Sequence, residues 1–321
     1  RLRKAVNVGC DLFTLNPVDF DININLRNKY ISNLGNFISI LSDIAKSLII
    51  KTGKKIKDYK IFDNDKFTGK YDDLVNSLLK SKNKVILFGS LVSSSPDFSK
   101  ISSLLVLISK LTNSNIGFLT DGCNSAGGYI SGFIPFRYSG GNKVEKNIGM
   151  NTKDMLVDGL KSYILYGVDP EFDTFFGFNA IKSLKNAEFV LSFTSFVNDT
   201  LFDTSDVLLP IASSYENSGT YVNLSNKWQS FLPVVNHSKD VKLGWNAICE
   251  FAKYLNFSGF DYLESSLILN ELKLNSKKEI FEFCSWNTIN VSDLSSKIPT
   301  DKLVSVPLVS GFGTDSLVRR A

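Results

Sequence analysis

Residues 203–229 read DTSDVLLPIASSYENSGTYVNLSNKWQ. This stretch holds two segments typical of strands, separated by a polar break. The apolar run Asp206–Ala212 has the length of a strand. Pro210 near its end favours a strand end or a sheet edge, because proline donates no hydrogen bond to a neighbouring strand. After a pair of serines, Gly219–Asn223 joins a glycine to β-branched residues and predicts a tight turn into a second extended piece. The residues alone therefore predict a strand, a polar loop and a strand.

Upstream of that stretch, a strand, a helix and a second strand follow one another. Val85–Gly89 is a short apolar run closed by glycine, which is typical of a buried strand. Ile101–Leu111 has apolar residues at helical spacing, and Pro96 and Asp97 stand where that helix would begin. Ile116–Thr120 is then a second short strand, so the segment is predicted to be a βαβ unit with parallel strands.

The same alternation continues through most of the chain. Leu34–Ile50 has the three-and-four spacing of an amphipathic helix, and Gly53 marks its end. Further helices are predicted over 71–79, 152–160, 244–255 and 263–274, and further strands over 162–167, 189–193 and 207–209. The predicted fold class is α/β, doubly wound with mainly parallel sheets, followed by an irregular helical C-terminal region.

Composition narrows the class of protein. Hydrophobic residues make up 43% of the chain, which is ordinary for a globular protein. No run approaches the roughly 18 consecutive apolar residues of a membrane span, so we expect membrane association only through a partner. The 36 basic and 32 acidic residues give a net charge of +4 and are scattered. Because a nucleic-acid binder more often carries a basic stripe, we expect no nucleic-acid partner.

The residue types that usually hold metals or carry out catalysis are sparse. None of the cysteines (Cys10, Cys123, Cys249 and Cys284) has the C-x-x-C spacing of a zinc or iron–sulfur site, and free thiols in a reducing compartment are expected. The one histidine, His237, lies in a polar stretch that favours a surface position. No Ser-His-Asp or Cys-His pair can be nominated, so we expect neither catalytic residues nor a metal site in this chain.

The glycine-rich segment Asp121–Gly141 follows a predicted strand, where α/β sheets commonly bind ligands. Its glycines do not form G-x-G-x-x-G, and no lysine completes the G-x-x-x-x-G-K-[ST] pattern of a phosphate loop. We interpret the segment as a flexible connection. A nucleotide-binding α/β domain stays an alternative for the chain.

Several segments resemble the molybdopterin oxidoreductases in chain order. DVLLPIA (206–212) and ENSGTYVN (216–223), followed by Gln229, resemble that family's late signature, roughly A-D-V-V-L-P-x-A and then E-x-x-G-T-Y-x-N-x-E-G-R-x-Q. VILFGS (85–90) resembles its V-x-L-G-S strand. YILYGVDP (163–170) resembles its L-x-x-x-G-x-N-P turn, and AEFVL (187–191) its preceding strand.

Within that superfamily the chain is most similar to the C-terminal part of the large iron–sulfur subunit of respiratory complex I. RLRK (1–4), followed by a predicted strand and NPVD (16–19), and GTDSLVRRA (313–321) resemble segments of that branch. One departure is at residues 225–227, where this chain has SNK and the family has E-G-R, so a polar corner of the pterin pocket is altered. Glu216, Gly219, Asn223 and Lys227 are the candidate remnants of that pocket.

This resemblance implies a structural module without its own catalytic centre or cofactor. The chain would support NADH:ubiquinone electron transfer by an iron–sulfur neighbour within the proton-translocating NADH:ubiquinone oxidoreductase of the respiratory chain. The iron–sulfur clusters are expected in a missing N-terminal part or a partner chain, and the non-Met start is consistent with a split subunit. The expected partners are other complex I subunits, on the matrix side of the mitochondrial inner membrane.

The resemblance also divides the chain into regions. Residues 1–82 are expected to be the remnant of an N-terminal lobe that packs against missing or partner chain. Residues 83–242 are expected to form the molybdopterin-oxidoreductase-like α/β domain, and 243–321 the helical and irregular C-terminal region. The main alternative is a fragment of an active molybdopterin oxidoreductase, similar to a formate dehydrogenase.

Overall fold

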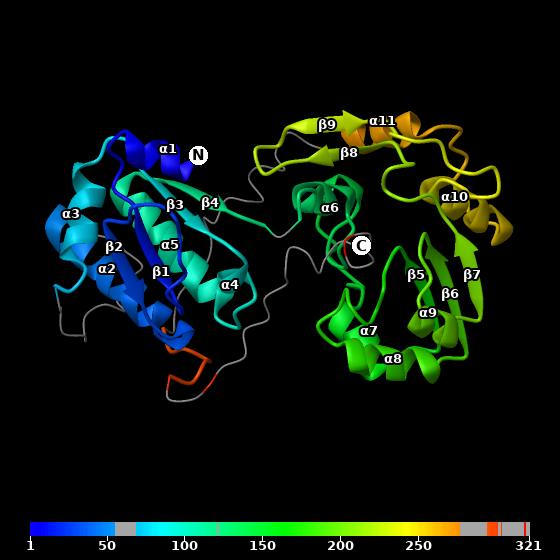
Figure 1. Ribbon diagram of the computed structural model, residues 1–321, viewed down its shortest axis with the longest axis horizontal. Helices are drawn as coiled ribbons and strands as arrows, with labels where there is room; N and C mark the ends of the chain where they lie inside the picture. Colours follow the sequence, from blue (N-terminus) through cyan, green and yellow to red (C-terminus); the bar gives the residue numbers. More distant parts are fainter. Residues whose placement is uncertain (55–68, 121, 277–293, 301–302, 304–317, 319–321) are drawn as a thin grey trace. The chain divides into compact units, whose positions relative to one another are not determined.

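The computed structural model describes residues 1–321 except 55–68, 121, 277–293, 301–302, 304–317 and 319–321. Two units form the chain: in Figure 1 one is coloured blue to cyan, together with the red-orange residues 294–300, and the other is coloured green to orange. Unit 1 comprises Arg1–Asp121 with Ser285–Leu308, and unit 2 comprises Gly122–Cys284 with Val309–Ala321.

Unit 1 combines helices with two pairs of parallel strands. Its elements are α1 (Leu2–Asn7), β1 (Phe13–Asn16), β2 (Asn28–Ile31), the 3₁₀ turn η1 (Leu34–Asn36), α2 (Phe37–Thr52), α3 (Asp72–Lys80), β3 (Val85–Phe88), α4 (Ser90–Ser93), α5 (Phe98–Thr112) and β4 (Asn115–Phe118). β1 pairs with β2 and β3 with β4, in both cases parallel. The predicted βαβ unit is thus present as β3, α5 and β4.

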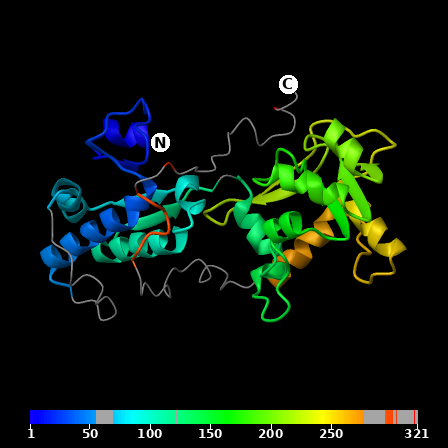
Figure 2. The same cartoon turned by 90° about the horizontal axis from the view of Figure 1, so that it is seen from below.

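The core of unit 1 lies between α2 and α5. Their apolar stripes are buried together with the Val75 side chain of α3 and the Phe88 ring of β3. α2 ends where predicted, because Gly53 adopts a left-handed φ of 64°, which glycine accepts without a Cβ penalty. Figure 2 shows the N-terminal segment (dark blue) on one side of the layer that these helices form. Burial of the two stripes against each other accounts for both helices.

Residues 294–300 are far from this core in sequence but pack onto it. Ile298 is 5% exposed and belongs to the same apolar cluster. The buried carboxylate of Asp97, at the start of α5, accepts hydrogen bonds from Ser296 Oγ at 2.5 Å and from the backbone N–H of Lys297 at 3.0 Å. Asp97 therefore fastens this late segment to unit 1.

Unit 2 contains the remaining described elements. They are α6 (Ser125–Ser131), the 3₁₀ turn η3 (Ser139–Gly141), α7 (Thr152–Asp158), β5 (Ser162–Tyr166), α8 (Gly177–Lys185), β6 (Phe189–Thr194), α9 (Asp199–Thr204), β7 (Val207–Pro210), β8 (Gly219–Val222), β9 (Trp228–Phe231), α10 (Gly244–Tyr254) and α11 (Ser265–Asn275). β5, β6 and β7 form a parallel sheet in that order, and β8 and β9 form an antiparallel hairpin.

The three-stranded sheet carries apolar side chains on both faces. Tyr163 and Leu165 of β5 pack with α8 on one face, and Phe193 of β6 packs against Phe251 of α10 on the other. β7 lies at the sheet edge and ends at Pro210, as its proline predicts. Helices on both faces of parallel strands confirm the predicted α/β fold class.

Three expectations from the sequence differ from the structure. The strand at Val85 is buried on one face only, since the side chains of Val85 and Leu87 are 57% and 41% exposed while Phe88 packs inward. The glycine-rich segment contains the helix α6, which Gly132 ends in a left-handed conformation, and the 3₁₀ turn η3, so its interpretation as a flexible connection is wrong. Residues 2–7 form α1 ahead of the first strand, which begins only at Phe13.

The predicted regions also differ from the observed units. Residues before and after position 82 share one core in unit 1, and the sheet and α10 share one core in unit 2. The units therefore divide near residue 121 and not at 82 or 242. Cys284 and residues 313–321, Val318 apart, lie outside the described residues. In the described part of the chain, no helix combines the length and hydropathy needed to span a membrane.

Candidate functional site

The predicted pocket residues lie on the hairpin of unit 2 and the loop before it. β8 and β9 are joined by a tight turn in which Asn226 adopts a left-handed φ of 57°, a conformation that asparagine tolerates better than most residues. The side-chain oxygen of Asn223 accepts hydrogen bonds from the backbone N–H groups of Ser225, at 3.0 Å, and Lys227, at 2.9 Å. Asn223 therefore shapes the turn from inside.

Glu216 shapes the loop between β7 and β8. Its carboxylate accepts hydrogen bonds from the backbone N–H and the hydroxyl of Ser213, each at 2.8 Å. These bonds, with a smaller contribution from His237, hold the pKa of Glu216 below its ordinary value. The Asn217 amide donates to the carbonyls of Ala212 and Ser213 at 2.8 Å and closes the same loop.

Gly219 lies close to an aromatic ring within the hairpin, so a larger residue there would displace that ring. A Cβ at this position would lie 2.7 Å from the Phe231 ring, closer than carbon atoms pack. That ring also meets Tyr221 edge to face, with 5.0 Å between centroids. The contact with the Phe231 ring thus gives the small residue at position 219 a structural reason that involves no ligand.

Two further contacts fix the hairpin within unit 2. The backbone N–H of Val222 in β8 donates to the side-chain oxygen of Asn124, just before α6, at 2.8 Å. The Lys273 ammonium of α11 lies 5.8 Å from the centre of the Trp228 ring in β9. The glycine-rich segment therefore packs against the hairpin.

The four candidate residues do not assemble a ligand cradle. Glu216 and Asn223 direct their oxygens at N–H groups of their own loop and turn, Gly219 faces an aromatic ring, and Lys227 is exposed. As placed, this set does not fit a pterin, which needs donors and acceptors converging on one space. Their origin as remnants of a pterin pocket stays a prediction.

Metal-binding residue types are also dispersed. Within the described ranges, no group of three or more His, Cys, Asp or Glu side chains is placed to hold a metal ion. Cys10 and Cys123 are exposed free thiols and Cys249 is buried, with its pKa raised by that burial. The cysteines described by the structure thus show no clustered site.

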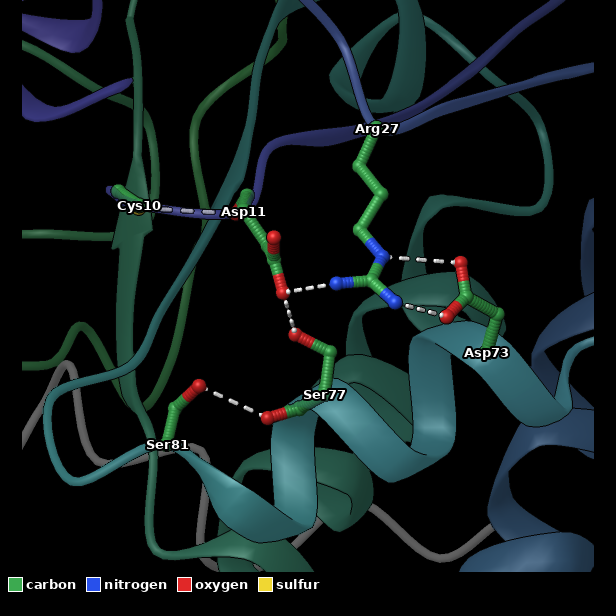
Figure 3. Close-up of polar contacts among 6 residues, drawn as sticks. All are labelled: Cys10, Asp11, Arg27, Asp73, Ser77 and Ser81. Atoms are coloured by element: carbon green, nitrogen blue, oxygen red, sulfur yellow. Dashed lines mark hydrogen bonds and ion pairs between the residues drawn. The ribbon is translucent and has the colours of Figure 1, made fainter. Parts of the chain in front are cut away.

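A polar cluster that the sequence did not reveal lies in unit 1 (Figure 3). The Arg27 guanidinium makes two hydrogen bonds to the carboxylate of Asp73 in α3, at 3.1 and 2.6 Å, and one to Asp11 at 2.8 Å. Ser77 Oγ donates to the same Asp11 oxygen at 2.8 Å. Hydrogen bonds from Ser77 and Arg27 lower the pKa of Asp11. We call these four residues the Arg27 cluster, and it fastens the N-terminal segment to α3.

Beside the Arg27 cluster lies a cavity of about 1150 Å³. It is partly open to solvent and lined by unit 1 alone, and its lining includes every residue of β1 and of β3. Asp11 and Ser77 stand at its polar side, and apolar residues of α2 and α5 form much of the remaining wall. No sequence motif marks it, because its lining comes from segments that are far apart along the chain.

Replacing Glu216 by glutamine is expected to weaken the β7–β8 loop in a pH-dependent way. The pKa of Glu216 is lowered in the folded state, so its stabilising contribution is present above the unfolded pKa of about 4.3 and is lost as pH falls through the folded pKa. The Tm deficit of Glu216→Gln against wild type should be constant near pH 7 and shrink below about pH 4. An equal deficit at pH 7 and below pH 4 would show that the charge of Glu216 plays no part.

Comparisons with known proteins fit this fold. The family model described as molybdopterin oxidoreductase matches residues 42–254. The G subunit of NADH-quinone oxidoreductase from Rickettsia prowazekii (strain Madrid E) is 29% identical over 165 residues, or 51% of this chain. The match covers 22% of that relative, so the chain spans about a fifth of its length. This similarity confirms the predicted resemblance to a complex I subunit of this type.

Solved structures add a more distant likeness. The formyltransferase/hydrolase complex (FhcABCD) from Methylorubrum extorquens, in complex with methylofuran, aligns with a TM-score of 0.45 and 11% identity. The alignment covers 73% of this chain and 63% of that chain, and carries no weight for fold or function at this degree of likeness. The family match, by contrast, extends over more than half of the sequence and both units. This chain belongs to the molybdopterin oxidoreductase family.

Proposed function

We propose that this chain is a structural, non-redox module of a respiratory NADH–quinone oxidoreductase. Its similarity to one subunit of such an enzyme supports the choice of complex. The observation that carries the non-redox part is the hairpin turn. Residues 225–227, which replace the family's E-G-R, form a turn held by Asn223, and Glu216 is engaged by Ser213. The signature's polar groups stabilise the fold instead of presenting themselves to a ligand.

In this proposal the chain supports electron transfer indirectly. The iron–sulfur clusters belong to an N-terminal part or a partner chain, and this module packs with other complex I subunits. We place it on the matrix side of the mitochondrial inner membrane, held there through the complex. The similar protein is bacterial, so the equivalent bacterial position is the cytoplasmic side of the respiratory membrane.

Elemental and pterin analysis of the purified chain, together with native gel migration, tests the proposal. We expect no stoichiometric iron, molybdenum or pterin, and comigration of the chain with a large membrane complex extracted in mild detergent. Bound molybdopterin would favour the alternative of a fragment of an active, formate dehydrogenase-like enzyme. Migration of all the chain as a free monomer from the same extract would exclude a complex I role.

A further inference from the structure

Two loops of unit 2 meet at the carboxyl end of its parallel sheet, where α/β sheets commonly bind ligands and partners. One follows β5 and the other follows β6. The Asn198 amide donates a hydrogen bond to the Asp169 carboxylate at 2.7 Å, and the Thr200 hydroxyl donates one to Glu171 at 2.6 Å. These bonds join the two loops into one surface. We call this surface the acidic–aromatic face, and it comprises residues 168–175 and 197–203.

The acidic–aromatic face exposes an unusual number of large apolar side chains. Those that are between 36% and 69% exposed are Val168, Phe172, Phe175, Val197 and Phe202. Single exposed apolar side chains are common on proteins, whereas a group that comes from two adjoining loops is typical of an interaction surface. The face therefore has the apolar character of a docking site.

The charge on the same face has one sign. Its carboxylates are those of Asp169, Glu171, Asp173, Asp199 and Asp203, and neither of its two segments contains Lys, Arg or His. In the part of the chain that the structure describes, Glu171, Asp199 and Asp203 form no ion pair. Surfaces that bind each other carry complementary charges. Exposed rings beside carboxylates thus call for an occupant with both apolar and cationic side chains.

The chain itself contains a segment of that chemistry. Arg319 and Arg320 are the only adjacent arginines in the sequence, and they follow the apolar residues Leu317 and Val318. A guanidinium group forks onto carboxylates and also stacks on aromatic rings, which a lysine ammonium does less well. Val309–Ala321 belongs to unit 2, although the residues before it belong to unit 1. The segment is therefore grouped with the unit that carries the acidic–aromatic face.

We propose that residues 317–320 of this chain dock on the acidic–aromatic face, with the two guanidinium groups on its carboxylates and the Leu and Val side chains on its rings. Of these four residues, the structure describes Val318 alone. Complementary charge and the grouping with unit 2 support this occupant over a partner protein. The inference goes beyond the proposed function, because the docking occurs within one chain and needs no complex.

Modification of the arginines by phenylglyoxal in the purified full chain tests the docking. Digestion after Lys302 by the protease Lys-C releases residues 303–321, in which mass spectrometry measures the modified arginines. A synthetic peptide of the same residues gives the unprotected rate. We expect modification about tenfold slower in the chain than in the peptide at low salt, as two exposed ion pairs allow. In 1 M NaCl the two rates should converge, because salt screens exposed charges. Equal rates at low salt would overturn the proposal.

Paired variants identify the surface that protects the arginines. Glu171→Gln combined with Asp173→Asn removes two charges, while the amide oxygens can still accept the hydrogen bonds that the carboxylates accept. We expect this variant to modify its arginines at nearly the peptide rate. Asp158→Asn combined with Asp240→Asn removes two exposed carboxylates of unit 2 outside the face and should keep the wild-type rate. Equal acceleration in both variants, or in neither, would contradict docking on this face.

Concentration and folding controls complete the test. Protection that disappears when the chain is diluted would assign the face to the C-terminal segment of a second copy and overturn docking within one chain. Thermal unfolding separates release of the segment from loss of the fold. The proposal requires faster modification in Glu171→Gln/Asp173→Asn at an unchanged circular dichroism spectrum, and at every protein concentration.

Discussion

Replacing Phe193 by alanine is expected to lower the free energy of unfolding of unit 2 by about 3–5 kcal/mol. Phe193 lies in β6, the central strand of the sheet, and its side chain is 2% exposed. Its ring centroid is 5.9 Å from that of Phe251 in α10 and 6.2 Å from that of Tyr166 in β5. Truncation would leave a cavity between the sheet and α10 that neither rigid element can fill.

Phe178→Ala is the matched control for this prediction. Phe178 lies in α8 of the same unit, and its side chain is 83% exposed. The same chemical change should therefore alter stability by about 0.5 kcal/mol or less. Urea unfolding followed by circular dichroism, with the intrinsic tryptophan fluorescence of the chain as a second probe, gives both values. Similar losses in the two variants would mean that α10 does not pack on β6 as the structure has it.

The sequence predicted the parts of the fold that depend on local patterns. α2 and α5 follow from the spacing of their apolar residues, and Gly53 ends α2 by a backbone conformation that few other residues adopt. The edge position of β7 follows from Pro210, since proline cannot bond a further strand. Each of these features depends on residues that are close together in the chain, and so it can be predicted from one sequence.

The hairpin was predicted only in part. β8 was expected from its glycine and β-branched residues, whereas β9 was not, because Trp228–Phe231 is too short to show an alternating pattern. What makes β9 a strand is the turn before it, where Asn223 bonds back to Lys227 and Asn226 takes a left-handed conformation. The same turn changes how Asn223 is interpreted. The resemblance to the family alone suggests that Asn223 belongs to a ligand pocket, whereas in the structure its side chain accepts hydrogen bonds within the turn.

The Arg27 cluster and the cavity beside it could not be predicted. Arg27 and Asp73 are 46 positions apart, and each alone is an ordinary surface charge in the sequence. Likewise, nothing in VILF, residues 85–88, shows that only one of its faces is covered. These features depend on how distant segments come together, and so no local pattern in the sequence shows them.

Replacing Asp97 by asparagine is expected to release residues 294–300 from the core of unit 1. Asp97 is 1% exposed, and its carboxylate accepts hydrogen bonds from Ser296 Oγ and from the Lys297 N–H, 200 positions away in sequence. An amide in its place turns an N–H₂ group toward one of these donors and removes the charge that strengthens both bonds. Hydrogen bonds to charged groups contribute about 1.5–3 kcal/mol each, so we expect a loss of about 2–3 kcal/mol in the docking of this segment.

Trypsin cleavage after Lys297 measures that release directly, because the bond must leave the surface of unit 1 to enter a protease. Cleavage limited by transient opening should accelerate about 30- to 150-fold in Asp97→Asn, as the expected loss requires. Asp21→Asn, which removes an exposed carboxylate from the same unit, should cleave at the wild-type rate. Equal rates for Asp97→Asn and Asp21→Asn would mean that the apolar contact of Ile298 holds the segment without the carboxylate. An acceleration confined to Asp97→Asn would show that one buried carboxylate holds this segment against α5, although the two are 200 positions apart in sequence.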